Sequence, residues 1–141
     1  MAITSAICNS FKTEILTGVH NFTASSGDTF NLALYTSSAS LGAGTTAYTT
    51  SEEVSGTGYT AKGNALTSVT PTLDSSTAVC DFADTSFTSA SFTARGAIIY
   101  NTTNNKTVAV IDFGKDQTVT GGTLTVSFPA ADAVNAIIRI R

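Results

Sequence analysis

A chain of 141 residues with a formal net charge of −3 has the size of one domain and can bury a core without a disulfide or a metal. Only 12% of the residues are charged, and the seven lysines and arginines are scattered, which argues against binding to nucleic-acid phosphates. No run of about 18 apolar residues occurs, so the sequence predicts no membrane-spanning helix. We expect one domain over residues 1–141, with a helical segment over residues 1–22 and a β-domain over residues 28–141.

The first segment predicts the one helix of the chain, over Ser5–Thr17. Its apolar residues recur four positions apart: Ile7, Phe11 and Ile15. The hydroxyl of Thr4 or Ser5 can cap the first turn, and Gly18 suits the left-handed residue that closes a helix. The apolar stripe either covers the core of its own β-domain or docks on a neighbouring subunit.

Beyond the helix the pattern changes to the two-residue period of a strand, over Phe30–Thr36. The side chains expected to share one face are Phe30, Leu32 and Leu34. Ser37–Thr50 is small and polar, which predicts a loop with too few large apolar residues to add to a core. A loop of this length is costly to order unless something holds it, which hints at contact with another chain.

Further strands are expected over Tyr59–Leu66 and, with a weaker pattern, over Leu73–Phe82. Pro71 favours an extended conformation and a sheet edge, because proline cannot donate to a strand ladder. The clearest pair is Ala94–Tyr100 and Thr107–Phe113, joined by turn-forming residues over Asn101–Lys106. Both strands hold near-continuous apolar runs, so we expect both faces of the pair to be covered.

Gly121-Gly122 predicts a tight hairpin between Thr118–Thr120 and Thr123–Phe128, because glycine tolerates the positive φ of such turns. The inward residues of the second strand would be Leu124, Val126 and Phe128. In the last segment, Ala136–Ile140, we expect Ile138 and Ile140 to point inward and the two arginines outward. Recurring strands without a second helix predict a mainly β fold, an antiparallel β-sandwich or barrel-like domain with one N-terminal α-helix.

Catalytic chemistry finds little support in the sequence. His20 lies just past the helix end, where the helix dipole is a sufficient structural reason for it. Cys8 and Cys80 match no metal spacing and fit buried free thiols, although a disulfide between them stays open. Two carboxylate pairs could hydrolyse glycosides: Glu52/Glu53 and Asp81/Asp84. The chain has no tryptophan to stack on a sugar, and Asp81/Asp84 fits a turn, so we expect no enzyme, no cofactor and no metal site.

Five stretches stand out in order along the chain: MAITSAICNSFKTEILTGVHNF, FNLALYTSSA, EEVSGTGYTAKGNAL, ARGAIIYN and VAVIDFGKDQTVTGGTLTVSFP. Their more specific parts are Val54-Ser55-Gly56-x-Gly58-Tyr59 and Ala94-Arg95-Gly96-Ala97. Together, over most of the chain, they resemble a group of small virion structural proteins of tailed bacteriophages, of the type that occurs in marine and cyanobacterial phages. The resemblance implies a virion component and brings no catalytic residues with it.

Within a virion we expect a capsid decoration, or cement, protein, made in the host cytoplasm and carried on the capsid surface. Its partner would be the major capsid protein, and it would form a homo-oligomer, with a trimer favoured. We expect no direct contact with nucleic acid or membrane. The residues expected at interfaces lie on the helical stripe, in the loop and near the last strand: Ile7, Phe11, Ile15, Leu41, Tyr48, Arg139 and Arg141.

Two other classes of protein stay open. One is a tail, collar or fibre-associated virion protein, which is also structural. The other is an adhesin that binds glycan on a host surface, for which exposed aromatic rings would be needed. Tyr48 and Tyr59 are its candidates, and their alternative role is packing at a sheet edge.

Overall fold

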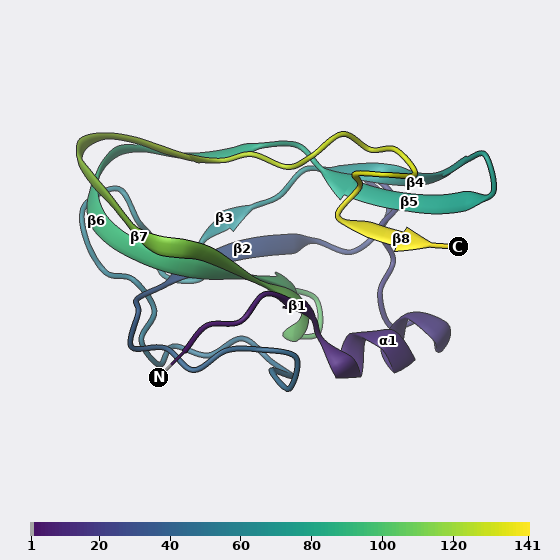
Figure 1. The fold of residues 1–141 in the computed structure, drawn as a ribbon, viewed down its shortest axis with the longest axis horizontal. Coiled ribbons are helices and arrows are strands. Elements are labelled where there is room, and N and C mark those ends of the chain that lie inside the picture. The colour runs from purple at the N-terminus through teal and green to yellow at the C-terminus, as the bar shows by residue number, and fades with distance from the viewer. Residues whose placement is uncertain (1) are drawn as a thin grey trace.

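The computed structural model describes residues 2–141 and consists mainly of antiparallel strands in two sheets (Figure 1). The larger sheet has the order β1-β7-β6-β2-β3 and the smaller one the order β4-β5-β8. The elements are β1 (Ala6–Ile7), α1 (Asn9–Leu16), β2 (Phe30–Tyr35), β3 (Asn64–Ala65), β4 (Ser68–Asp74), β5 (Thr77–Phe82), β6 (Thr85–Asn101), β7 (Lys106–Val126) and β8 (Ile138–Ile140). The predicted class, a mainly β and sandwich-like antiparallel fold with one short N-terminal helix, is confirmed.

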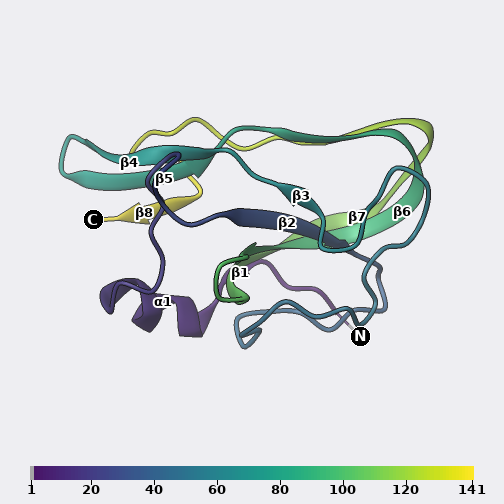
Figure 2. The same ribbon diagram turned by 180° about the vertical axis from the view of Figure 1, so that it is seen from behind.

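A long hairpin of β6 and β7 organises the molecule. The two strands pair from Asn101 opposite Lys106 to Thr85 opposite Val126, and the predicted turn-forming residues join them. Near that turn both faces are buried, as the apolar runs predict: Ala97–Tyr100 and Val108–Val110. Figures 1 and 2 show the hairpin bending back on itself at one end of the molecule, while α1 and the smaller sheet lie at the other end.

The bend coincides with β-bulges between β6 and β7. One of these bulges shows that a prediction from the sequence is wrong. Gly121-Gly122 forms no hairpin, because β7 continues through it: Ala90 pairs with Gly122 and Ser91 with Thr120. Gly121 has a φ of 59° and no opposite residue, so its positive φ belongs to a β-bulge rather than to a tight turn. The expected alternation after it is confirmed, since the apolar residues face inward and the hydroxyl residues are exposed: Thr123, Thr125 and Ser127.

The helix begins later than the sequence predicts. Ala6–Ile7 forms β1 and pairs with β7, because the edge of the larger sheet offers backbone partners to this segment. The predicted cap at Thr4 or Ser5 is therefore wrong; Cys8 stands at the N-cap and makes no side-chain cap bond.

The helix ends at Leu16, one residue before the predicted end, and Gly18 closes it as predicted. Gly18 has a φ of 74°, and the N–H of Val19 donates to the carbonyl of Glu14 over 3.0 Å. This is the hydrogen bond of a Schellman motif, in which a left-handed glycine closes the last turn. The chain then turns back toward the sheet at His20.

Three predictions for the other strands need correction. Most of Tyr59–Leu66 is irregular or in turns, and only β3 remains as a strand, because this segment folds around the partly buried carboxylate of Glu53, described below. Leu73–Phe82 is not one strand but parts of β4 and β5, which turn at Ser75-Ser76 with a φ of 57° at Ser75. Ile140 was expected inside and is 55% exposed. Pro71 lies in β4, an edge strand, as predicted.

The loop over residues 37–50 has no regular structure, as predicted, yet it does add to the core. Ala39 and Leu41 are buried, so the expectation that the loop contributes nothing to the core is wrong. Its own chain holds it: the N–H of Leu41 donates to the carbonyl of Ala2 over 3.1 Å, and the N–H of Thr4 donates to the carbonyl of Leu41 over 2.9 Å. The ordering of this loop therefore needs no second chain.

An aromatic cluster joins the two sheets to the segment after α1. The ring of Phe30 on β2 stacks on Phe22 at 4.4 Å and meets Phe82 of β5 at 5.8 Å. This aromatic cluster ties one end of the smaller sheet to the rest of the molecule.

Both cysteines are buried free thiols, as expected, and burial raises the pKa of Cys80 to about 12.

Candidate functional site

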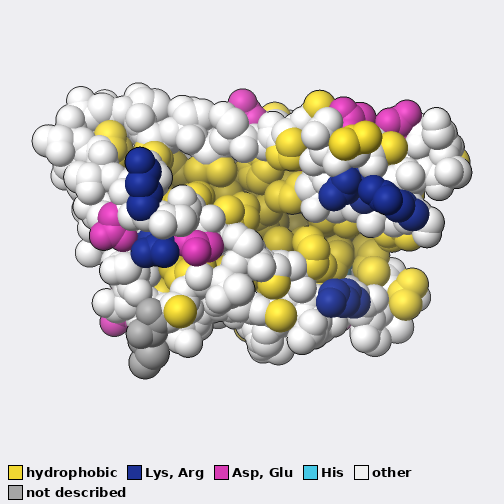
Figure 3. All heavy atoms as spheres, in the orientation of Figure 1, with side chains coloured by type: hydrophobic (Ala, Val, Ile, Leu, Met, Phe, Trp, Pro, Cys, Tyr) yellow, Lys and Arg dark blue, Asp and Glu magenta, His cyan; other side chains and the backbone are white. Residues whose placement is uncertain are grey.

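An apolar groove lies between α1 and β8 and is open to the surface. Its volume is about 440 Å³, and its apolar lining comes from both elements and from β1: Ile7, Phe11, Ile15, Leu16, Ile138 and Ile140. A second hollow of about 460 Å³ shares Ile137 with it and continues along β7, past Phe113, Leu124 and Phe128. We call the first of these hollows the β8 groove. Figure 3 shows apolar side chains running across this hollowed face of the molecule.

The groove exists because short elements meet there. Phe11 is 3% exposed and packs against His20 and Phe22, which fixes the helix to the core. The eight-residue helix and the three-residue β8 are too short to cover the space between them. A smaller cavity of about 100 Å³ lies behind the groove, between the helix and the smaller sheet. The two layers are therefore less closely packed here than in an ordinary protein interior.

The predicted interface residues fall into two groups. Ile7, Phe11, Ile15 and Arg139 line the β8 groove together, and Arg141 follows β8 and is exposed. Leu41 and Tyr48 lie apart from it, on a separate hollow formed by their own loop and the residues near Ala2.

Five residues that line the groove are not among the predicted interface residues: Lys12, Leu16, Ile137, Ile138 and Ile140. Two of them, Ile138 and Ile140, were expected to point into the core instead. A sequence signal for this pair was the alternation around Arg139, which puts two isoleucines on one face of a short segment. Their contact with the helix could not be foreseen, because it depends on how the smaller sheet packs.

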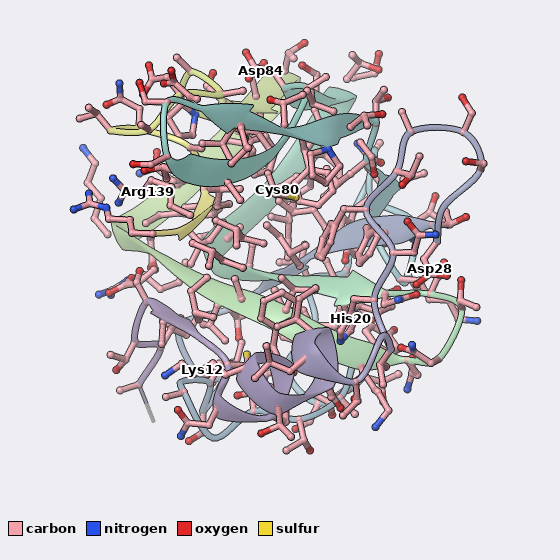
Figure 4. The ribbon with its side chains drawn as sticks, turned by 90° about the vertical axis from the view of Figure 1, so that its right-hand side faces the viewer. Lys12, His20, Asp28, Cys80, Asp84 and Arg139 are labelled. Carbon is pink, nitrogen blue, oxygen red and sulfur yellow. The ribbon has the colours of Figure 1, made fainter. Side chains whose placement is uncertain are left out.

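The rim of the groove is basic. Lys12 and Arg139 line it, and Figure 4 shows these two side chains on the same side of the molecule, one from α1 and one from β8. No aspartate or glutamate is among the residues that line it in the described part of the chain. The ammonium of Lys12 donates to a neutral partner, the side-chain oxygen of Asn9, over 3.3 Å, and the guanidinium of Arg139 donates to the carbonyl of Val134. Two cations thus flank an apolar surface in a chain whose net charge is −3.

A second cluster of polar groups surrounds Glu53. None of its residues lines the β8 groove. The hydroxyls of Tyr48 and Tyr59 donate to its two carboxylate oxygens over 2.5 and 2.6 Å, and the N–H of Lys62 donates over 2.7 Å. Burial, followed by the bond to Glu53, raises the pKa of both phenols, so they stay protonated donors. Tyr48 also stacks on Tyr100 at 4.8 Å. The two tyrosines considered for glycan binding are therefore partly buried, and their hydroxyls are engaged by Glu53.

We predict that Glu53→Gln lowers the free energy of unfolding by about 2 kcal/mol, because the amide cannot accept two phenol bonds and a backbone bond as a carboxylate does. Urea denaturation followed by tyrosine fluorescence measures the change. The control is Glu52→Gln at the neighbouring, exposed position, where we expect a change within about 0.5 kcal/mol. Equal losses in the two variants would contradict a specific role of Glu53.

The only histidine serves the structure. His20 is 5% exposed, its Nδ1 lies 3.1 Å from Nδ2 of Asn101, and its Nε2 lies 3.1 Å from Oε1 of Glu14. An amide nitrogen only donates, so Nδ1 accepts and Nε2 carries the proton toward Glu14. Glu14 also pairs with Lys106 at 2.9 Å, and hydrogen bonds to it lower its pKa against the effect of burial. The network fastens the end of α1 to the β6–β7 turn.

The second candidate carboxylate pair, Asp81/Asp84, also binds backbone. Asp81 is 1% exposed and its Oδ1 accepts from the N–H of Phe82 over 2.8 Å, while burial raises its pKa. Asp84 accepts from the N–H of Phe128 over 2.7 Å. Within residues 2–141, no group of three or more histidine, cysteine or acidic side chains could hold a metal ion. None of the helices over the same residues is long and apolar enough to cross a membrane.

Comparisons with known proteins give no relative: no family model, curated protein or solved structure matches this chain.

Proposed function

We propose that this chain is a structural protein of a tailed-phage virion, and specifically a capsid decoration protein that binds the major capsid protein and stabilises the shell. The observation that carries the proposal is the β8 groove, an apolar surface left open beside basic residues in a domain whose core is otherwise buried. Contiguous exposed apolar surface of this kind is typical of contact sites. The resemblance of the five sequence stretches supplies the phage context.

The physical logic of such a protein is linkage. A ligand that binds only the assembled shell shifts the equilibrium toward assembly by mass action. Many copies that each contact several subunits gain further from multivalency, which suits a homo-oligomer such as a trimer. The outward positions in the last part of β7 fit close packing of many copies, because they carry neutral hydroxyls rather than charges: Thr118, Thr120, Thr123 and Thr125.

The copy number in purified virions tests this proposal. Quantitative gel analysis, with an antibody raised against the purified chain, is expected to show a copy number comparable with that of the major capsid protein. Particles stripped of the chain are expected to lose their genome at a lower temperature, and adding the chain back should restore the resistance. A handful of copies would instead assign the chain to the tail or collar, and absence from virions would refute the proposal.

A further inference from the structure

We propose that the β8 groove binds an extended, apolar and acidic segment of a partner protein, which adds to the free edge of β8. This inference rests on the proposed function and names the chemistry of the partner's contact. Three observations carry it, and each concerns a different property of the groove: exposed apolar side chains, an unpaired strand edge and a positively charged rim.

The first observation is the exposure of large aliphatic side chains at the groove. Leu16 is 84% exposed and Ile140 is 55% exposed, and both line it. Ile138 and Ile15, on the same surface, are only partly buried. Removing such side chains from water is favourable, and no segment within residues 2–141 does so here. An apolar partner would complete this packing.

The second observation is the edge of β8. The strand pairs with β5 on one side, with Cys80 opposite Ile138 and Ala78 opposite Ile140. On its other side no strand follows in the described residues, because β8 ends the order of the smaller sheet. An extended segment can pair with such an edge through its backbone, and every second side chain then points to the same face. Side chains on that face would enter the groove beside Ile138 and Ile140.

The third observation is charge, and it selects the partner. Lys12 and Arg139 line the groove, the exposed Arg141 follows β8, and no carboxylate lines the groove in the described part of the chain. Hydrogen bonds from Asn135 and Val134, and then the charge of Arg139, lower the pKa of Asp132, which is not part of the lining. The nearby Glu14 is already paired with His20 and Lys106. A second copy that paired its own β8 with this edge would bring arginines opposite arginines, which is destabilising. A segment with aspartate or glutamate between its apolar residues meets the same cations favourably.

A display library of short random peptides, selected on the purified chain, tests the inference. We expect enrichment of sequences that alternate Val, Ile or Leu with Asp or Glu. The best acidic peptide, measured by fluorescence anisotropy, should bind about tenfold more weakly to Arg139→Glu than to the unmodified chain. Ile140→Asp should also weaken binding about tenfold, because it places a like charge and a polar group in the groove.

The matched control is Leu73→Asp, which changes another exposed aliphatic residue, 72% exposed, on the opposite edge strand of the same sheet. It should leave peptide binding unchanged. Because Leu73 and Ile140 are both exposed, neither variant should unfold, and thermal melting checks this. Equal weakening by Leu73→Asp would overturn the proposal.

Three further results would also overturn it: no enriched peptide, enrichment of basic or purely apolar peptides, or self-association of the chain that Ile140→Asp abolishes. Sedimentation velocity measures the last of these. The virion copy number is independent of this selection. A high copy number in virions without selection of acidic peptides would refute the proposed binding at the groove and leave the decoration role standing. Selection of acidic peptides without incorporation into virions would refute the decoration role and leave the binding at the groove standing.

Discussion

Gly63→Ala is expected to lower the free energy of unfolding by about 3 kcal/mol or more, which places it among the most damaging single substitutions in the chain. A Cβ built on Gly63 would lie 1.8 Å from the carbonyl oxygen of Leu32 and 2.8 Å from the Cα of Ala33. Both neighbours belong to the backbone of β2, the strand that pairs with β3 and β6, so neither can move aside cheaply. The φ of 79° adds strain for any residue with a Cβ.

The consequences should spread to the Glu53 cluster. The carbonyl of Lys62, the residue before Gly63, accepts from the hydroxyl of Tyr100 over 2.8 Å, and the N–H of Lys62 donates to Glu53. Displacing Gly63 from β2 therefore also displaces one donor to Glu53, the N–H of Lys62. Urea denaturation measures the loss, and hydrogen exchange should show faster exchange in β2 and β3.

Two other glycines separate the causes of this loss. Gly44→Ala meets no atom within 4 Å and has no positive φ, so we expect a change within about 0.5 kcal/mol. Gly114→Ala also meets nothing but has a φ of 81°, so it should cost about 1 kcal/mol through backbone strain alone. A loss at Gly63 no larger than that at Gly114 would contradict the steric explanation.

Local patterns predicted those parts of the fold that depend on neighbouring residues. The apolar runs on either side of the Asn101–Lys106 turn predicted the central hairpin, since each run is long enough to pair without a distant element. Gly18 predicted the end of α1, because a left-handed closing residue is a local requirement. The alternation after Gly122 predicted which side chains face the core.

The errors lie where a distant partner decides the structure. A positive φ at Gly121 fits a hairpin turn and a bulge equally well, and only the length of β6 selects the bulge. Ala6–Ile7 has helical spacing, yet the edge of β7 draws it into a strand. Tyr59–Leu66 has strand composition, yet Glu53 holds Tyr59 and Lys62 in turns. None of these competing contacts can be recognised from the residues themselves.

The candidate site likewise has one part that local patterns predict and one part that depends on distant contacts. The stripe of Ile7, Phe11 and Ile15 is a local pattern, and these residues do meet at one surface. The groove itself needs β8 to lie across from the helix, more than a hundred positions away in the chain. That juxtaposition depends on the aromatic cluster around Phe30, which holds the smaller sheet against the segment that follows α1.

Phe30→Ala is therefore expected to cost about 4 kcal/mol of unfolding free energy. The ring is fully buried, lies nearly parallel to Phe22 at an interplanar angle of 7°, and contacts Phe82 of the smaller sheet. Its removal leaves a cavity lined by three elements that belong to different layers, so the surroundings cannot collapse to fill it. Phe30→Leu, which retains part of the volume, should lose about half as much and remain measurable if the alanine variant does not fold.

Phe128→Ala provides the contrast, because this ring also contacts Phe82, at 5.8 Å, but lies half-buried on the open side of the molecule. We expect it to cost about 1 kcal/mol in urea denaturation, since the hollow it lines is already open to water. Near-equal losses for Phe30→Ala and Phe128→Ala would mean that the two sheets are held together elsewhere. In that case the position of β8 opposite the helix, and with it the geometry of the groove, would need another physical cause than the aromatic cluster.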